Sequence, residues 1–230
     1  MKKTVVALLA LGVASVGLAA PAAAYDRDAY AYGASHMIGY KDIPKSLNVK
    51  RGAFVNASAG SSVFICGDDS KTVSFPGGEF NFSISYTGRG QTDGINVNVD
   101  QYASANKAIA AFDKLKAGLK RCEGESSGQE NYGTDDAPSI DTWSRLNTTG
   151  VVPLVTVAGV ESVFLNQNYQ DVTTGEYPGT YTSDSYTVYT LVGDSIISTN
   201  RNTGSEINLS TKERRAVNQV AFNAVTRWVD

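Results

Sequence analysis

The chain has 230 residues, of which 42% are hydrophobic and 19% charged, with 22 glycines, 6 prolines and 2 cysteines. These proportions are those of an ordinary globular protein and exclude a disordered or collagen-like chain. The formal net charge of −3 argues against nucleic acid as a partner, because neutralising a phosphate backbone requires clustered lysine and arginine. The single histidine, His36, excludes most histidine-dependent metal sites and disfavours histidine-based catalysis.

Residues 1–24 have the three parts of a secretory signal peptide. A lysine pair comes first, residues 5–18 form a short uncharged apolar stretch, and residues 22–24 are small alanines that suit a cleavage site. The apolar stretch is short for a membrane span, and no basic stop-transfer cluster follows it. We therefore expect a secreted mature chain that begins at Tyr25 and has no membrane span, with retention at the cell wall left open.

Cys66 and Cys122 are the only cysteines, and both fall in the expected mature chain. In an oxidising compartment one disulfide is the default for such a pair. It would enclose 55 intervening residues, and loss of unfolded-chain entropy would then stabilise the fold by at most about 4 kcal/mol. Two free thiols are the alternative.

The first half of the mature chain is predicted to be mostly strands. Residues 25–62 show no clear period and are interpreted as an N-terminal segment of the domain. Residues 63–66 form a short apolar strand. Residues 79–86 and 95–100 alternate strictly between apolar and polar, which is typical of half-buried antiparallel strands, and residues 87–94 form a flexible loop between them.

An amphipathic helix is predicted over residues 104–121, with Ser104 as its cap. Its apolar stripe consists of Ala108, Ile109, Phe112, Leu115, Leu119 and Cys122. A disulfide from Cys122 would therefore attach this helix to the strand at residues 63–66. Residues 123–141 follow with six carboxylates, three glycines and no basic residue, which predicts a solvated loop.

The second half is rich in predicted strands, at residues 142–146, 151–157 and 160–169. The best hairpin joins residues 186–192 to residues 195–201 through a two-residue turn, where glycine at the first position suits a type II′ turn. In that register the cross-strand pairs are Leu191 with Ile196 and Tyr189 with Ser198.

A last helix begins at Ser210, which forms a capping box with Glu213. Its apolar face consists of Val217, Val220, Ala221, Ala224, Val225 and Trp228. Two amphipathic helices and five to seven antiparallel strands predict an α+β domain over residues 63–230, with the helices packed on one face of the sheet.

No catalytic signature is present. The Gly-Asp-Ser sequence at residues 193–195 has no downstream histidine, and the glycines at 88–94 miss dinucleotide-binding spacing. We therefore expect no catalytic residue, no metal site and no cofactor. Carboxylates that remain available for glycoside hydrolysis are Asp68, Asp69, Glu161 and Glu176.

Two features are candidates for ligand binding. Arg214 and Arg215 lie in the first turn of the last helix, where the helix dipole disfavours cations unless an anion binds there. Tyr186 and Tyr189 belong to a cluster of five tyrosines within 21 residues, and such clusters can line a glycan or lipid cleft. The ordinary alternatives are solvated arginines and tyrosines that simply favour strands.

The order of elements resembles the PknH-like extracellular sensor domain of high-GC Gram-positive bacteria over about residues 43–230. The resemblance rests on the strand that ends at Cys66, the helix that ends in Leu119-Lys120-Arg121-Cys122, the late hairpin at residues 186–197 and the closing helix. It implies an antiparallel sheet with helices and a cleft for an extracellular ligand. In this chain it would be a stand-alone secreted member, with one cysteine pair where the kinase-linked members have two disulfides.

The sequence thus predicts a secreted, non-enzymatic, sensor-like domain that binds an unknown small molecule or a cell-envelope component. A secreted hydrolase that uses carboxylates and a cell-surface protein-interaction module are the alternatives.

Overall fold

The computed structural model describes residues 27–59, 63–65, 73–88, 94–134, 137–152, 160–175, 178–203 and 208–230. The predicted signal peptide at residues 1–24, Cys66 and the middle of the predicted loop at 87–94 lie outside the described residues, as does most of the predicted strand at 151–157.

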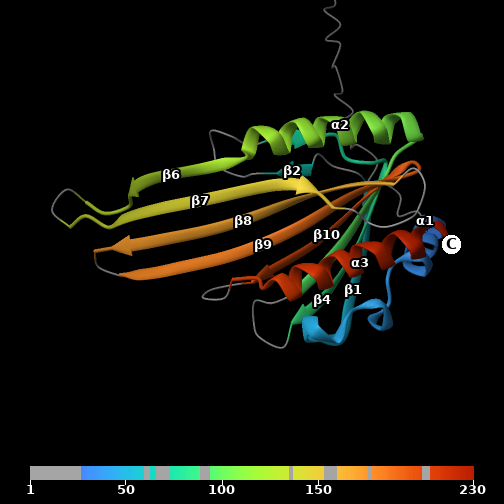
Figure 1. Cartoon of the computed structure of the whole chain (residues 1–230), viewed down its shortest axis with the longest axis horizontal. Coiled ribbons are helices and arrows are strands. Elements are labelled where there is room, and N and C mark those ends of the chain that lie inside the picture. The colour runs from blue at the N-terminus through green and yellow to red at the C-terminus, as the bar shows by residue number, and fades with distance from the viewer. Residues whose placement is uncertain are drawn as a thin grey trace, which may run out of the picture.

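Three α-helices, two short 3-10 helices and ten strands are formed by the described residues (Figure 1). The helices are α1 (Arg27–His36), η1 (Tyr40–Asp42), η2 (Lys45–Leu47), α2 (Ala105–Cys122) and α3 (Thr211–Val229). The strands are β1 (Val49–Ala59), β2 (Val63–Ile65), β3 (Val73–Phe75), β4 (Phe80–Gly88), β5 (Gly94–Gln101), β6 (Gly124–Asn131), β7 (Ile140–Val151), β8 (Glu161–Thr174), β9 (Gly179–Val192) and β10 (Ser195–Thr203).

Eight of these strands form one antiparallel sheet in the order β1-β4-β5-β10-β9-β8-β7-β6. The remaining two, β2 and β3, pair with each other and form a separate small sheet. The predicted α+β class is confirmed. The main sheet has one strand more than the upper end of the predicted range, because β1 and β6 come from segments whose sequence shows no strand signal.

The prediction that helices cover only one face of the sheet is wrong. Successive residues of a strand point to opposite faces, and Ile196 packs in a cluster with α2, whereas Ile197 packs in a cluster with α3. Figure 1 shows α2 along one side of the sheet and α3 along the other. The central strands are therefore buried on both faces, which the alternating patterns of β4 and β5 do not reveal.

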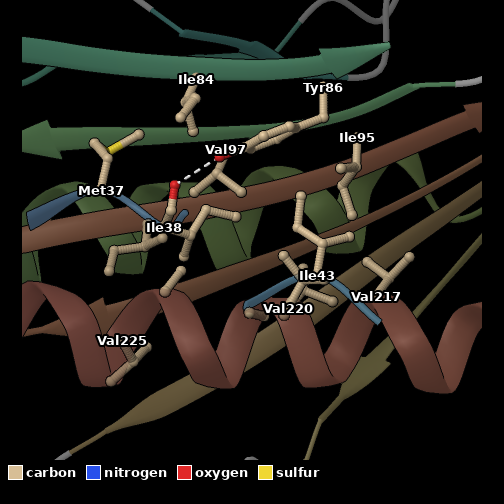
Figure 2. Close-up of a cluster of buried hydrophobic side chains, with 14 of the residues drawn as sticks. Met37, Ile38, Ile43, Ile84, Tyr86, Ile95, Val97, Val217, Val220 and Val225 are labelled. Atoms are coloured by element: carbon tan, nitrogen blue, oxygen red, sulfur yellow. Dashed lines mark hydrogen bonds between the residues drawn. The ribbon is translucent and has the colours of Figure 1, made fainter. Parts of the chain in front are cut away.

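The larger core lies between the sheet and α3 (Figure 2). It combines the predicted inward residues of β4 and β5, except the exposed Phe80, with the predicted apolar face of α3. The N-terminal segment adds side chains from around η1 and η2, namely Met37, Ile38, Ile43, Leu47 and Val49. Tyr86 links these parts, because its hydroxyl donates a 3.0 Å hydrogen bond to the carbonyl oxygen of Ile38. The buried side chains shown include Met37, Ile38, Ile43, Ile84, Tyr86, Ile95, Val97, Val217, Val220 and Val225.

The second core lies between α2 and the opposite face of the sheet. Phe112 and Leu115 of α2 are fully buried there against Tyr189 of β9 and Val163 of β8. Ser104 caps α2 as predicted, since its hydroxyl accepts a hydrogen bond from the backbone N–H of Lys107. Most of the predicted apolar stripe of α2 is confirmed, but Ile109 is exposed to solvent.

The hairpin of β9 and β10 has the predicted register, with Leu191 opposite Ile196 and Tyr189 opposite Ser198. Gly193 has φ of +57°, which the first position of a type II′ turn requires. Ser195, next to this turn, is buried, and its hydroxyl accepts a hydrogen bond from the indole of Trp228.

The predicted solvated loop at residues 123–141 is the largest error in the sequence-based elements. Gly124–Asn131 forms β6, which pairs with β7 along its whole length. An edge strand with solvent on both faces needs no apolar residues, because its backbone hydrogen bonds alone hold it to the sheet. Its polar composition therefore resembles that of a loop.

Asp100 generates a testable pH dependence of stability. This carboxylate is buried, and burial raises its pKa above the ordinary value of 3.8, although hydrogen bonds from Asn81 and the Gly78 backbone oppose the shift. Between the ordinary and the raised pKa the folded state holds a proton that the unfolded chain has lost, so stability falls as pH rises through this window.

We expect Asp100→Asn to remove this contribution, because the amide oxygen still accepts both hydrogen bonds and does not ionise. Urea unfolding from pH 3 to pH 8 measures it as the difference between the two profiles. Parallel profiles would contradict the assignment.

Candidate functional site

The long strands at one end of the sheet extend past the helices (Figure 1). We call this part the blade, and it consists of residues 124–131, 140–146, 168–174 and 179–184 of β6, β7, β8 and β9. Its two faces continue those that α2 and α3 cover elsewhere. A sheet face without a covering helix must interact with solvent or with a ligand. The blade is therefore the candidate location of a ligand-binding site.

A trough of about 650 Å³ lies on the face of the blade that continues the α3 side. Its floor is made by two rows of residues that cross the strands. One row is Ser127, Ser144, Gln170 and Thr182, and the next is Glu125, Leu146 and Asn168, which ends at the buried Asp184 beside the trough. Asn208, which precedes α3, lies at its border. The floor is therefore formed mainly by hydroxyl and amide groups, where a helix-covered face would carry valine or isoleucine.

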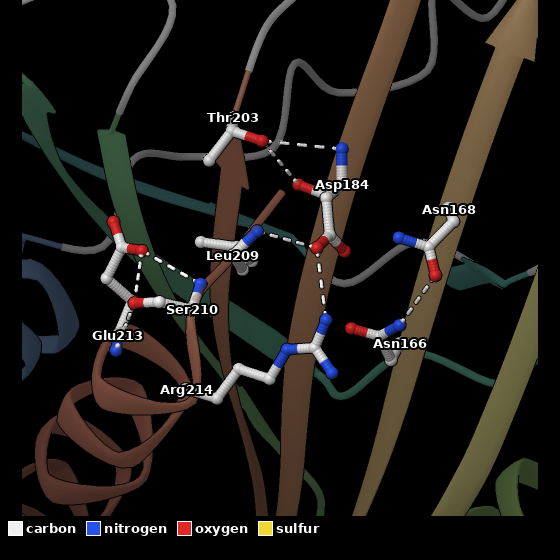
Figure 3. Close-up of polar contacts among 8 residues, drawn as sticks. All are labelled: Asn166, Asn168, Asp184, Thr203, Leu209, Ser210, Glu213 and Arg214. Carbon is white, nitrogen blue, oxygen red and sulfur yellow. Dashed lines mark hydrogen bonds and ion pairs between the residues drawn. The ribbon is translucent and has the colours of Figure 1, made fainter. Parts of the chain in front are cut away.

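A buried carboxylate lies at the inner end of the trough (Figure 3). Asp184 is the cross-strand partner of Asn168 and has no exposed surface. Its Oδ2 accepts a 2.7 Å hydrogen bond from the Leu209 backbone N–H and forms a 3.1 Å ion pair with Arg214 of α3. Thr203 holds the backbone of Asp184 through its hydroxyl. This network connects the start of α3 to the middle of β9.

Three buried polar atoms in or beside this network have no hydrogen-bond partner among the described residues: Oδ1 of Asp184, Nε of Arg214 and Oδ1 of Asn166. Asn166 is buried, and its Nδ2 donates to Oδ1 of Asn168, which lines the trough. Buried polar atoms in folded proteins are normally paired, so unsatisfied ones are concentrated where a ligand or ordered water binds. These donors and acceptors lie beside the inner end of the trough, next to Asn168, and their residues are not among those that line it.

The first turn of α3 is fixed by the predicted capping box. Ser210 and Glu213 exchange hydrogen bonds in both directions, and Arg201 of β10 lies 3.9 Å from Glu213. Partial burial opposes ionisation of Glu213, but the hydrogen bonds from Ser210 outweigh it and lower the pKa of this carboxyl. The ionised Glu213 favours the helix start, whose dipole is positive.

Tyr186 and Tyr189 do not form one binding surface. They are three residues apart on β9 and therefore point to opposite faces of the sheet. Tyr186 is buried beside α3, where its hydroxyl donates to Asn218 and Arg214 lies over its ring. Tyr189 is buried against α2, and burial raises the pKa of its phenol. Both are buried in the two cores, and neither lines the trough.

Arg214 and Arg215 do not form one binding surface either, because they lie in different surroundings on α3. Arg214 points at Asp184, so the anion at this helix start is the protein's own carboxylate. Arg215 is exposed. Only Arg214 of the predicted ligand-binding residues lies at the border of the trough network.

The other predicted residues lie elsewhere. Glu161 forms a 3.0 Å ion pair with Lys116 of α2, at the far end of β8 from the trough. Asp68, Asp69 and Glu176 lie outside the described residues. Cys122 is buried at the end of α2, and no described cysteine is a free thiol. Since Cys66 is not among the described residues, the pairing of Cys66 with Cys122 stays a prediction.

Neither a metal-binding cluster nor a helix able to cross a membrane is found in the described parts of the chain. No group of three or more histidine, cysteine, aspartate or glutamate residues there could hold a metal ion. None of the described helices is long and apolar enough to cross a membrane.

The trough residues were missed by sequence reasoning. Serine, threonine, asparagine and glutamine carry no signature of their own, and the residues of β6 have the composition of a loop. One signal is present, because the segments Gln167–Gln170 and Tyr181–Ser185 lie within or beside predicted strands and have no aliphatic side chain.

Comparisons with known proteins give a weak likeness at the level of the fold. No family model matches the chain. No curated protein matches it. The extracellular domain of PknH from Mycobacterium tuberculosis is a solved structure with 12% identity and a TM-score of 0.42, over 84% of this chain and 94% of that domain. This likeness is weak, and the resemblance given from the sequence stays a prediction.

The ion pair at the trough gives a matched test. Arg214→Ala leaves the carboxylate of Asp184 buried without its cation, and we expect the free energy of unfolding to fall by about 2 kcal/mol, since Arg214 is only half-buried. Arg215→Ala, in the same helical turn, is the control and should change stability by less than about 0.5 kcal/mol. Equal losses in urea unfolding would show that the removal of an arginine from this helical turn, rather than the loss of the ion pair, is responsible.

Proposed function

We propose that this protein is a secreted, non-enzymatic binding protein that holds a polar, uncharged small molecule or part of a cell-envelope component in the trough. The observation that carries the proposal is the floor of the trough, where two rows of mostly neutral polar side chains replace the apolar face of a sheet. Hydroxyl and amide groups recognise a ligand by hydrogen bonds, and their positions on strands hold them rigidly.

The size and charge of the trough support this ligand class. A volume of about 650 Å³ is within the range of small-molecule sites. Glu125 and Arg145 are the charged residues among those lining it, but the guanidinium of Arg145 lies against the rings of Trp143 and Tyr169 on the opposite face. An anionic ligand would therefore find no cation on the floor of the trough, whereas a neutral ligand with several hydroxyl or amide groups would find many partners.

The proposal of a non-enzymatic role rests on the residue types in the trough. Among the described residues that line it, Glu125 is the one carboxylate, and none is a histidine, cysteine or lysine. Asp184 lies next to it with one oxygen engaged by Arg214 and Leu209. This set resembles a recognition surface more than an acid–base pair.

Blocking the trough tests the proposal. Ser144 is exposed in the floor, and Ser144→Trp should fill the space between Ser127 and Gln170. Thr142 is exposed on the same strand and face but does not line the trough, so Thr142→Trp is the matched control. Native mass spectrometry of the protein purified from its host's medium should show a discrete adduct on the wild type and on Thr142→Trp.

The adduct should be lost from Ser144→Trp. An adduct that persists on Ser144→Trp would contradict binding in the trough. A bare wild-type ion, together with turnover of a substrate that Asp184→Asn or Glu125→Gln abolishes, would instead establish the hydrolase alternative.

Secretion and the disulfide are part of the same proposal. The chain in the medium should begin at Tyr25, and its mass should be two hydrogens below that of the reduced chain, because Cys66 and Cys122 are paired. Reduction should lower the free energy of unfolding by at most about 4 kcal/mol, the entropy of closing a loop of this length. A full reduced mass, or alkylation of Cys122 in the folded protein, would contradict the bridge.

A further inference from the structure

The opposite face of the blade carries a ladder of aromatic and cationic side chains, of which Arg145 and Tyr169 also border the trough. The ladder consists of Trp143, Arg145, Tyr169 and Tyr181. The guanidinium of Arg145 lies 5.9 Å from the centroid of the Trp143 ring and 5.6 Å from that of Tyr169. The ring of Tyr169 in turn lies 6.2 Å from that of Tyr181. Three strands thus contribute to one connected surface.

Strand register explains why these residues meet. Trp143 of β7 is opposite Asp171 of β8, which is opposite Tyr181 of β9, and the next row contains Arg145, Tyr169 and Ser183. All of them point to the face that α2 covers farther along the sheet. The helix ends at Cys122, whose carbonyl oxygen accepts a hydrogen bond from Asn147, one row before the ladder begins.

A glycine in the neighbouring strand makes room for the indole. Gly128 of β6 is opposite Trp143, and a Cβ atom at Gly128 would lie 2.6 Å from the Trp143 ring. The ring therefore lies across the strand edge. A purely solvated tryptophan would not need this close fit.

A small polar pocket of about 300 Å³ adjoins the ladder. Arg145 and Tyr169 line both, and the remaining lining residues supply amides and hydroxyls. These are Gln167, Ser183, Ser185 and Asn202. Flat rings beside planar amides are the arrangement that binds a sugar, since the ring faces contact its C–H groups and the amides bind neighbouring hydroxyls.

We propose that the ladder and this pocket form a second binding site, on the opposite face from the trough, for a neutral saccharide. Tyr181 is 44% exposed, so part of its surface is open to a ligand. Arg145 already lies between two rings, which leaves less of the ladder to receive a ligand cation. Glu130, Asp141 and Asp171 point to the same face and disfavour polyanions.

The proposal stands apart from the proposed function, because the two sites occupy opposite faces, although Arg145, Tyr169 and Ser183 border both. Ser144→Trp, which fills the trough, should leave saccharide binding unchanged. A negative binding result for one site therefore neither supports nor contradicts the proposal for the other site.

Intrinsic fluorescence gives a direct measurement. The chain has two tryptophans, and Trp228 is buried in the α3 core, so Trp143 is the one placed to respond to a ligand on the blade. The probes are neutral hexasaccharides of glucose, N-acetylglucosamine, xylose and galactose, titrated to about 10 mM, which covers weak binding. We expect a saturable spectral shift with at least one of them, and protection of Trp143 from acrylamide quenching.

Variants identify the surface. Tyr181→Ala, measured by calorimetry with the saccharide that binds, should weaken affinity about tenfold through loss of ring contact. Gln167→Ala should weaken it as well. Tyr132→Ala is the control, since Tyr132 is 68% exposed at the blade tip, is hydrogen-bonded to Glu130 and is not part of the ladder.

The absence of saturable binding by every neutral saccharide would overturn the proposal. Binding confined to a sulfated or uronic polysaccharide, abolished by salt, would also overturn it, because it would show charge attraction to Arg145. Equal affinities of Tyr181→Ala and the wild type would exclude the ladder as the site.

Discussion

Strands β8 and β9 are longer than the helices that could cover them, and the rest of the structure follows from this mismatch. Fourteen strand residues span about 48 Å, whereas the nineteen residues of α3 span about 28 Å. One end of the sheet is therefore buried on both faces and the other end is open on both. The buried end carries the stability of the protein, and the open end is free to carry polar residues.

The boundary between the two ends is marked by charge. Along β9 the side chains facing α3 change from Val188 and Tyr186, which are buried in the core, to Asp184, which is buried but ionisable, and then to Thr182 in the trough. The burial of a carboxylate at this position is tolerated only because Arg214 and the Leu209 N–H compensate its loss of hydration. The core between α3 and the sheet thus ends where α3 begins, beside Asp184, and the trough begins at the same position.

The sequence predicts the buried end well and the open end poorly, for physical reasons. Strict alternation identifies β4 and β5, and the Ser210 capping box locates α3, because burial and caps restrict residue type. An edge strand such as β6 has no buried face, so nothing in its composition separates it from a loop. Arg214 could be singled out from its place against the helix dipole, but its partner Asp184 depends on strand register, which no local pattern encodes.

Neighbouring residues of a strand face opposite sides of the sheet. Alternate residues of the same strands therefore form the trough and the ladder. Gln170 floors the trough, while Tyr169 and Asp171 on either side belong to the ladder face. Inserting or deleting one residue within β8 would exchange the two sets and destroy both surfaces at once. During divergence these strands can therefore change by substitution on one face at a time, whereas changes in length are confined to the turns at their ends.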